Sequence, residues 1–161
     1  MTETTPFIQP GSTIGILGGG QLGRMLALAA LQLGYKVHIY CTNKQAPAFD
    51  ATHLTTIGDY DDEKTLSAFA RSVDIVTFEF ENIPARALEV ISAIVPVAPG
   101  VKALAASQDR LSEKRFIESA GVDVAPYKPF ESADELEEAL RVVGRPAVAK
   151  RRLMSYDGKG Q

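Results

Sequence analysis

The chain has 161 residues, 45% of them hydrophobic and 23% charged, which is enough to bury one core, or one domain and part of another. Its net charge of -3 at pH 7 provides no positive surface for a nucleic-acid polymer or an anionic membrane. Because it has a single cysteine, Cys41, and neither a cationic leader nor a long apolar run, we expect a cytoplasmic protein without internal disulfides or membrane spans.

The first predicted element is a buried strand that leads through a glycine turn into a helix. The strand is expected at residues 14–17, the turn at 18–20 and the helix from 21 to a glycine cap at 34. The apolar helix positions that recur at helical spacing are Leu22, Met25, Leu26, Ala29, Ala30 and Leu33. Because such a turn directs backbone N–H groups from the positive end of the helix toward one point, it predicts an anion site, most often for phosphate.

The glycine spacing at 18–23 also matches the dinucleotide fingerprint, G-x-G-x-x-G. A nicotinamide or flavin dinucleotide site needs an acidic residue at the end of the second strand. That strand is expected at 36–41, with Cys41 as a small buried residue at its end, and the following residues 42–45 contain no acid. The sequence therefore disfavours an NAD site. Two alternatives stay open: Lys44 could bind the 2′-phosphate of NADP, or the turn could serve only to pack the helix on the strand.

Strands and helices continue to alternate up to residue 98. The expected elements are a strand at 53–57, a helix at 61–73, a strand at 74–78, a helix at 84–94 and a strand at 95–98. This alternation predicts an α/β fold with a doubly wound parallel sheet. His38 and His53 are expected as strand residues rather than metal ligands, because neither has a partner at ligand spacing.

An acidic segment follows the fourth predicted strand. Ligands of such sheets bind beyond the carboxyl ends of the strands, so residues 79–82 and the glycine turn should share one crevice. Glu79 and Glu81 would point the same way in an extended chain, which suits vicinal hydroxyls or an amine. The alternative is that both are solvated charges or help to start the helix at Pro84.

From Gly100 the pattern changes to short helices and a cationic end. The expected elements are helices at 101–106 and 111–120, an extended stretch at 125–130, a helix after the capping box 132–135, and a strand at 146–150. The final segment, 155–161, has two glycines around a lysine and follows three cations. It predicts a loop over a polyphosphate, or a flexible tail.

Four motifs in order resemble the N5-carboxyaminoimidazole ribonucleotide synthase family of ATP-grasp enzymes. They are GILGGGQLGRM from residue 15, TFEFENIP from 77, QDRLSEKRF from 108 and KRRLMSYDGKGQ from 150. The resemblance implies a preATP-grasp, Rossmann-like substrate-binding domain at 1–106. It also implies a linker helix and the beginning of an ATP-grasp lid domain, truncated, at 107–161.

The family resemblance implies a ligase reaction in purine biosynthesis. Bicarbonate attacks the γ-phosphate of ATP to give carboxyphosphate, and the amino group of 5-aminoimidazole ribonucleotide captures the carboxyl group. The resemblance also implies a homodimer and Mg²⁺, whose ligands would lie in a C-terminal domain beyond this sequence, so we expect the chain alone not to turn over. Another ATP-grasp purine enzyme, such as the formate-using glycinamide ribonucleotide transformylase, and a non-catalytic nucleotide-binding module stay open.

The resemblance also assigns site residues. The ribonucleotide site would comprise Gly19, Gly20, Gln21, Leu22, Glu79 and Glu81. The ATP site would comprise Arg110, Lys150, Ser155, Tyr156, Asp157, Gly158, Lys159, Gly160 and Gln161. Of these, Arg110 and Lys150 would neutralise charge that develops on the transferred phosphate. Met154 and Ser155 precede Tyr156 where many family members have a glycine, which would stiffen the loop.

Overall fold

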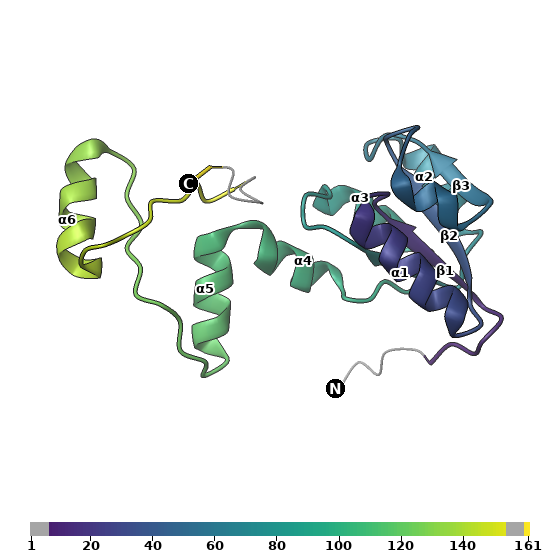
Figure 1. Ribbon diagram of the computed structural model, residues 1–161, viewed down its shortest axis with the longest axis horizontal. Helices are drawn as coiled ribbons and strands as arrows, with labels where there is room; N and C mark the ends of the chain where they lie inside the picture. The colour runs from purple at the N-terminus through teal and green to yellow at the C-terminus, as the bar shows by residue number, and fades with distance from the viewer. Residues whose placement is uncertain (1–6, 154–159) are drawn as a thin grey trace. The chain divides into compact units, whose positions relative to one another are not determined.

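The computed structural model describes residues 7–153 and 160–161, and Figure 1 shows its elements. The chain divides into two compact units, residues 1–104 and 105–161. Of the predicted loop over a polyphosphate, Ser155, Tyr156, Asp157, Gly158 and Lys159 lie outside the described residues, as does Met154.

The first unit is built on a parallel sheet of four strands in the order β3-β2-β1-β4. The strands are β1 (Thr13–Leu17), β2 (Lys36–Cys41), β3 (Leu54–Ile57) and β4 (Ile75–Phe78). The predicted bounds of β2 are confirmed, β1 begins one residue earlier than predicted, and β3 and β4 each begin one residue later. Because parallel neighbours require crossover connections, the order places helices on both faces of the sheet.

Two buried clusters, one on each face of the sheet, confirm the doubly wound arrangement. Helix α1 (Gln21–Gln32) packs with the short 3₁₀ helix η1 (Pro47–Ala51) over one cluster. Helices α2 (Glu63–Ala70) and α3 (Ala85–Ser92) cover the other cluster, as Figure 1 lets the reader follow. The sequence analysis missed η1, and α2 and α3 end two to three residues earlier than predicted, where helix ends commonly fray.

Of the apolar positions predicted for helix α1, Ala30 is buried and the others are exposed. The residues of α1 that are buried are Gly23, Ala27 and Ala30. In contrast, the side chains of Met25 and Leu33 are 64% and 69% exposed. The reason is the short distance between helix and sheet, which leaves room only for small side chains on the facing side.

The predicted fifth strand is reduced to a single bridge. Val97 pairs with Val76 of β4 in parallel, through hydrogen bonds from the Val76 N–H to the Pro96 carbonyl and from the Ala98 N–H to the Val76 carbonyl, both 2.9 Å. Pro96 has no N–H to donate, so the ladder cannot extend beyond this bridge on its side. The segment lies beside β4, as expected, without forming a strand.

The second unit contains helices without a strand among its described residues. Helix α4 (Val101–Gln108) crosses the division between the units, and α5 (Arg110–Ser119) and α6 (Ala133–Val143) follow. Helix α4 is two residues longer than predicted, and α5 begins one residue earlier. Asp109 separates them because its carboxylate caps α5, accepting from the N–H of Leu111 at 2.8 Å.

The capping box of α6 is confirmed with one change of partner. The Ser132 hydroxyl accepts from the Glu135 N–H at 3.3 Å, while the Glu135 carboxylate accepts from the N–H of Glu131 at 2.8 Å, not from that of Ser132. The predicted strand at 146–150 is wrong. These residues are exposed, and the described part of this unit offers no neighbouring strand to pair with.

The two histidines and the cysteine have different surroundings. His38 lies on β2, where its ring nitrogens are 2.8 Å from the Thr56 hydroxyl and 2.9 Å from the Ser72 hydroxyl, and burial lowers its pKa. His53 precedes β3, so its prediction as a strand residue is wrong. Cys41 is buried at the end of β2, as predicted.

Gly15, in the middle of β1, provides a test of the packing between the sheet and α2. A Cβ there would lie 2.8 Å from Phe69 Cζ and 3.1 Å from Val73 Cγ2. We expect Gly15→Ala to reduce the free energy of unfolding by about 1–3 kcal/mol through overpacking. Gly100→Ala, where a Cβ would meet nothing within 4 Å, is the control and should cost under about 0.5 kcal/mol in urea unfolding. Equal effects would contradict this account.

His38 predicts a pH dependence of stability. Its folded pKa is lowered from 6.5 by burial, so the unfolded chain takes up a proton more readily. The stability that the neutral His38 ring contributes to the folded chain is therefore complete above pH 6.5, and it is lost as the pH falls from there through the folded pKa. Urea midpoints at about pH 7.5 and about pH 5 should differ less in His38→Gln than in the wild type, and His53→Gln should keep the wild-type difference.

Candidate functional site

The glycine turn depends on close contacts that exclude side chains. Gly18 has a positive φ of 106°, and its N–H donates to the Tyr40 carbonyl at 2.9 Å. A Cβ on Gly23 would lie 2.7 Å from the Gly18 carbonyl oxygen, and one on Gly19 would lie 2.8 Å from Cys41 Sγ. The turn therefore holds the first residues of α1 directly over the carboxyl ends of β1 and β2.

Glu79 occupies the space that these glycines leave. Its Oε1 accepts from the Gly20 N–H at 3.1 Å, and a Cβ on Gly18 would overlap its side chain. The Glu79 N–H donates to the Leu17 carbonyl at 3.1 Å, which holds the residue at the end of β1. The predicted shared crevice is confirmed for Glu79, but the Gly20 N–H is not free for a phosphate, because a carboxylate of the chain accepts from it.

The prediction that Glu79 and Glu81 point the same way assumed an extended backbone, which the structure does not have at these residues. The backbone bends at both Glu79 and Glu81, so the chain is not extended there and the two side chains are not required to point the same way. Glu81 is half-buried on the loop between β4 and α3. Its role in binding stays a prediction.

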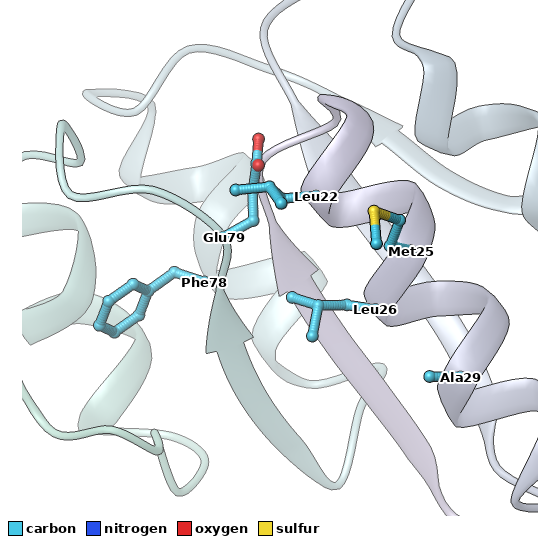
Figure 2. Close-up of a pocket in the computed structure, with 6 residues that line it drawn as sticks. All are labelled: Leu22, Met25, Leu26, Ala29, Phe78 and Glu79. Carbon is cyan, nitrogen blue, oxygen red and sulfur yellow. The ribbon is translucent and has the colours of Figure 1, made fainter. Parts of the chain in front are cut away.

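A cavity of about 340 Å³ lies beside this carboxylate. It is lined by Leu22, Met25, Leu26, Ala29, Phe78 and Glu79. Figure 2 shows the Glu79 carboxylate next to Leu22, near the N-terminal end of α1. Leu22 and Glu79 were assigned to a site from the sequence, and the other lining residues were not. Met25, Leu26 and Ala29 recur at helical spacing in α1, while Phe78 ends β4. Gln21 is exposed at the first position of α1.

The second unit brings together three parts of the predicted ATP site. The Arg110 N–H donates to the Arg152 carbonyl at 3.1 Å, so the start of α5 lies against the segment that follows Lys150. The Arg151 N–H donates to the Gly160 carbonyl at 2.8 Å. Residues that are far apart in the sequence therefore meet in one part of this unit.

An ion pair supports this arrangement. The Arg152 guanidinium donates to the carboxylate of Asp109, the residue that caps α5. The hydrogen bond from Arg152 and the N–H groups of α5 lower the pKa of Asp109, so the carboxylate stays ionised at neutral pH. The exposed Lys150 side chain directly precedes Arg151 and Arg152, whose backbone groups bond to Gly160 and Arg110.

The described residues, 7–153 and 160–161, contain no candidate metal site. No group of three or more His, Cys, Asp or Glu side chains in this part of the chain is placed to hold an ion.

Two family descriptions match the chain in succession. Residues 11–108 match the ribonucleotide synthetase preATP-grasp domain, and residues 115–161 match the ATP-grasp domain. The first match contains the glycine turn and Glu79, and the second contains Lys150 and Gly160.

Individual relatives carry a common name. The N5-carboxyaminoimidazole ribonucleotide synthase of Brucella melitensis is 42% identical over 154 residues, which are 96% of this chain and 42% of that protein. The crystal structure of the Staphylococcus aureus N5-carboxyaminoimidazole synthetase with ADP is 37% identical, with a TM-score of 0.88 over 98% of this chain and 43% of that chain.

A structure of the Aspergillus clavatus N5-carboxyaminoimidazole synthase, in complex with ADP and 5-aminoimidazole ribonucleotide, is 28% identical, with a TM-score of 0.74 over 85% of this chain and 37% of that chain. The chain thus spans less than half the length of each of these relatives. By its family match it belongs to the ribonucleotide synthetase preATP-grasp family, with an ATP-grasp segment after that domain, and in sequence and fold it is similar to the N-terminal part of N5-carboxyaminoimidazole ribonucleotide synthases.

Proposed function

We propose that this chain carries the ribonucleotide half-site, and part of the ATP site, of an enzyme that carboxylates 5-aminoimidazole ribonucleotide. The observation that carries the proposal is the Glu79 carboxylate held by the Gly20 N–H at the start of α1, inside the segment that matches the preATP-grasp family. The relative crystallised with ADP and 5-aminoimidazole ribonucleotide supports the choice of substrate over glycinamide ribonucleotide or NADP.

Glu79 determines which part of the ribonucleotide can bind at the glycine turn. A phosphate bound at the Gly20 N–H would lie next to the Glu79 carboxylate, and two negative charges in contact repel each other. Hydroxyl and amino groups instead donate to a carboxylate. We therefore propose that Glu79 accepts from the ribose hydroxyls or the amino group, with Gly19, Gly20, Gln21 and Leu22 around them and Glu81 nearby, while the substrate phosphate binds elsewhere.

The ATP side of the proposal rests on the second unit. ATP would supply the γ-phosphate that activates bicarbonate for attack by the amino group. Arg110, whose N–H donates to the Arg152 carbonyl, and Lys150, two residues before Arg152, would neutralise the charge that develops on this phosphate. In the same proposal, residues 1–106 bind the substrate and residues 107–161 are the beginning of the ATP-grasp domain. Gln161 would contact ATP.

Magnesium, bicarbonate, a homodimer and a cytoplasmic location complete the proposal. Divalent magnesium would bridge and neutralise the ATP phosphates, as in phosphoryl transfer generally. Within the described part of the chain, no helix is long and apolar enough to cross a membrane.

Calorimetric titration tests the choice of ligand. We expect the chain to bind 5-aminoimidazole ribonucleotide, and to bind glycinamide ribonucleotide and NADP at least about tenfold more weakly, a difference of about 1.4 kcal/mol. Tighter binding of NADP would favour a dinucleotide module, and tighter binding of glycinamide ribonucleotide would favour the transformylase. Either result would overturn the proposal.

A charge-removing substitution tests Glu79. Glu79→Gln keeps an oxygen that can accept from the Gly20 N–H but loses the charge, so we expect the affinity for 5-aminoimidazole ribonucleotide to fall about tenfold or more. Glu89→Gln is the matched control, because Glu89 pairs with Arg86 on the exposed side of α3. The affinity of the Glu89→Gln variant for 5-aminoimidazole ribonucleotide should stay within about twofold of wild type. An unchanged affinity in Glu79→Gln would remove Glu79 from the site.

A further inference from the structure

Aromatic side chains line the same edge of the sheet as Glu79. Tyr60 lies on the loop between β3 and α2, and Phe80 lies on the loop after β4. The ring centroids of Tyr60 and Phe80 are 6.3 Å apart, and those of Tyr60 and Tyr40 are 5.7 Å apart. Both loops leave the carboxyl ends of parallel strands, which is where such sheets bind ligands.

A hydrogen bond from Tyr40 holds the loop that carries Tyr60. Tyr40 is fully buried at the end of β2, and its hydroxyl donates to the carbonyl of Asp59 at 2.6 Å. Asp59 directly precedes Tyr60, so this bond holds the loop in place. Tyr60 itself packs against the core but stays partly exposed. A ring that is anchored on one side and open on the other can contact a ligand without rearrangement.

The electrostatic surroundings of Tyr60 connect it to the glycine turn. Burial raises its pKa, and the neighbouring Cys41 and Glu79 side chains raise it further. These two residues border the turn, because Cys41 Sγ would contact a Cβ on Gly19 and Glu79 accepts from the Gly20 N–H. The phenol therefore stays protonated at neutral pH and adds no further negative charge to the site.

We propose that Tyr60 forms the aromatic wall of the ribonucleotide site, with its ring packed against the heterocycle of the substrate while Glu79 accepts from the sugar or the amino group. The inference rests on the proposed function and adds the residue that distinguishes a ribonucleotide with an aromatic base from a bare sugar phosphate. Packing on an aromatic ring requires a π-face on the ligand, which the imidazole has and ribose 5-phosphate lacks.

The test compares two ligands on variants of this chain by calorimetry. Tyr60→Leu removes the ring, so we expect about tenfold weaker binding of 5-aminoimidazole ribonucleotide and a change of less than about twofold for ribose 5-phosphate. Tyr60→Phe keeps the ring and should stay within about threefold of wild type for both. Tyr35→Leu is the aromatic control, because Tyr35 lies before β2, at the other edge of the sheet, and should leave both affinities unchanged.

A fluorescence readout keeps the test independent of the stability of the leucine variant. The chain has no tryptophan, so Tyr60→Trp introduces a single indole. We expect 5-aminoimidazole ribonucleotide to quench its emission and ribose 5-phosphate to leave it unchanged.

Three outcomes would overturn the inference. Equal losses for both ligands in Tyr60→Leu, or no loss for either, would show that the ring does not pack on the heterocycle. An indole that does not respond to 5-aminoimidazole ribonucleotide would show the same. In those cases binding by the wild-type chain would leave the proposed function standing, whereas no binding of 5-aminoimidazole ribonucleotide by the wild type would overturn both.

Discussion

The first unit depends on the close approach of α1 to the carboxyl end of β1. That approach is possible because Gly18 adopts a positive φ and because Gly23 has no side chain to meet the Gly18 carbonyl oxygen, which would lie 2.7 Å from a Cβ. The remaining space admits the carboxylate of Glu79, which directly follows β4, much later in the sequence. A helix N-terminus carries partial positive charge, so an internal carboxylate stabilises it and sets the polarity of the site.

The same close approach explains why the larger apolar side chains of α1 face outward. Small residues such as Ala27 and Ala30 fill the narrow interface with the sheet. Leu22, Met25 and Leu26 therefore line a cavity next to Glu79 instead of joining the core. The charged acceptor at the glycine turn therefore lies beside an apolar surface that the core does not use.

The second unit depends on a different interaction. Asp109 both caps α5 and binds the Arg152 guanidinium, and one backbone bond joins Arg110 to Arg152. A single carboxylate thus connects a helix start to a segment that carries Lys150 and other cations. The pair thus brings positive charge from two distant parts of the sequence into one part of this unit.

The sequence by itself determined the alternating elements, the glycine turn and the family, because periodicity, glycine spacing and ordered motifs are local properties of the chain. Only the tertiary structure decided that Glu79 accepts from Gly20, that the apolar stripe of α1 is exposed, and that residues 95–98 and 146–150 are not strands. Each of these depends on which partner a segment meets in space. Tyr60 also escaped sequence reasoning, since its contacts with Tyr40 and Phe80 exist only after three strand ends come together.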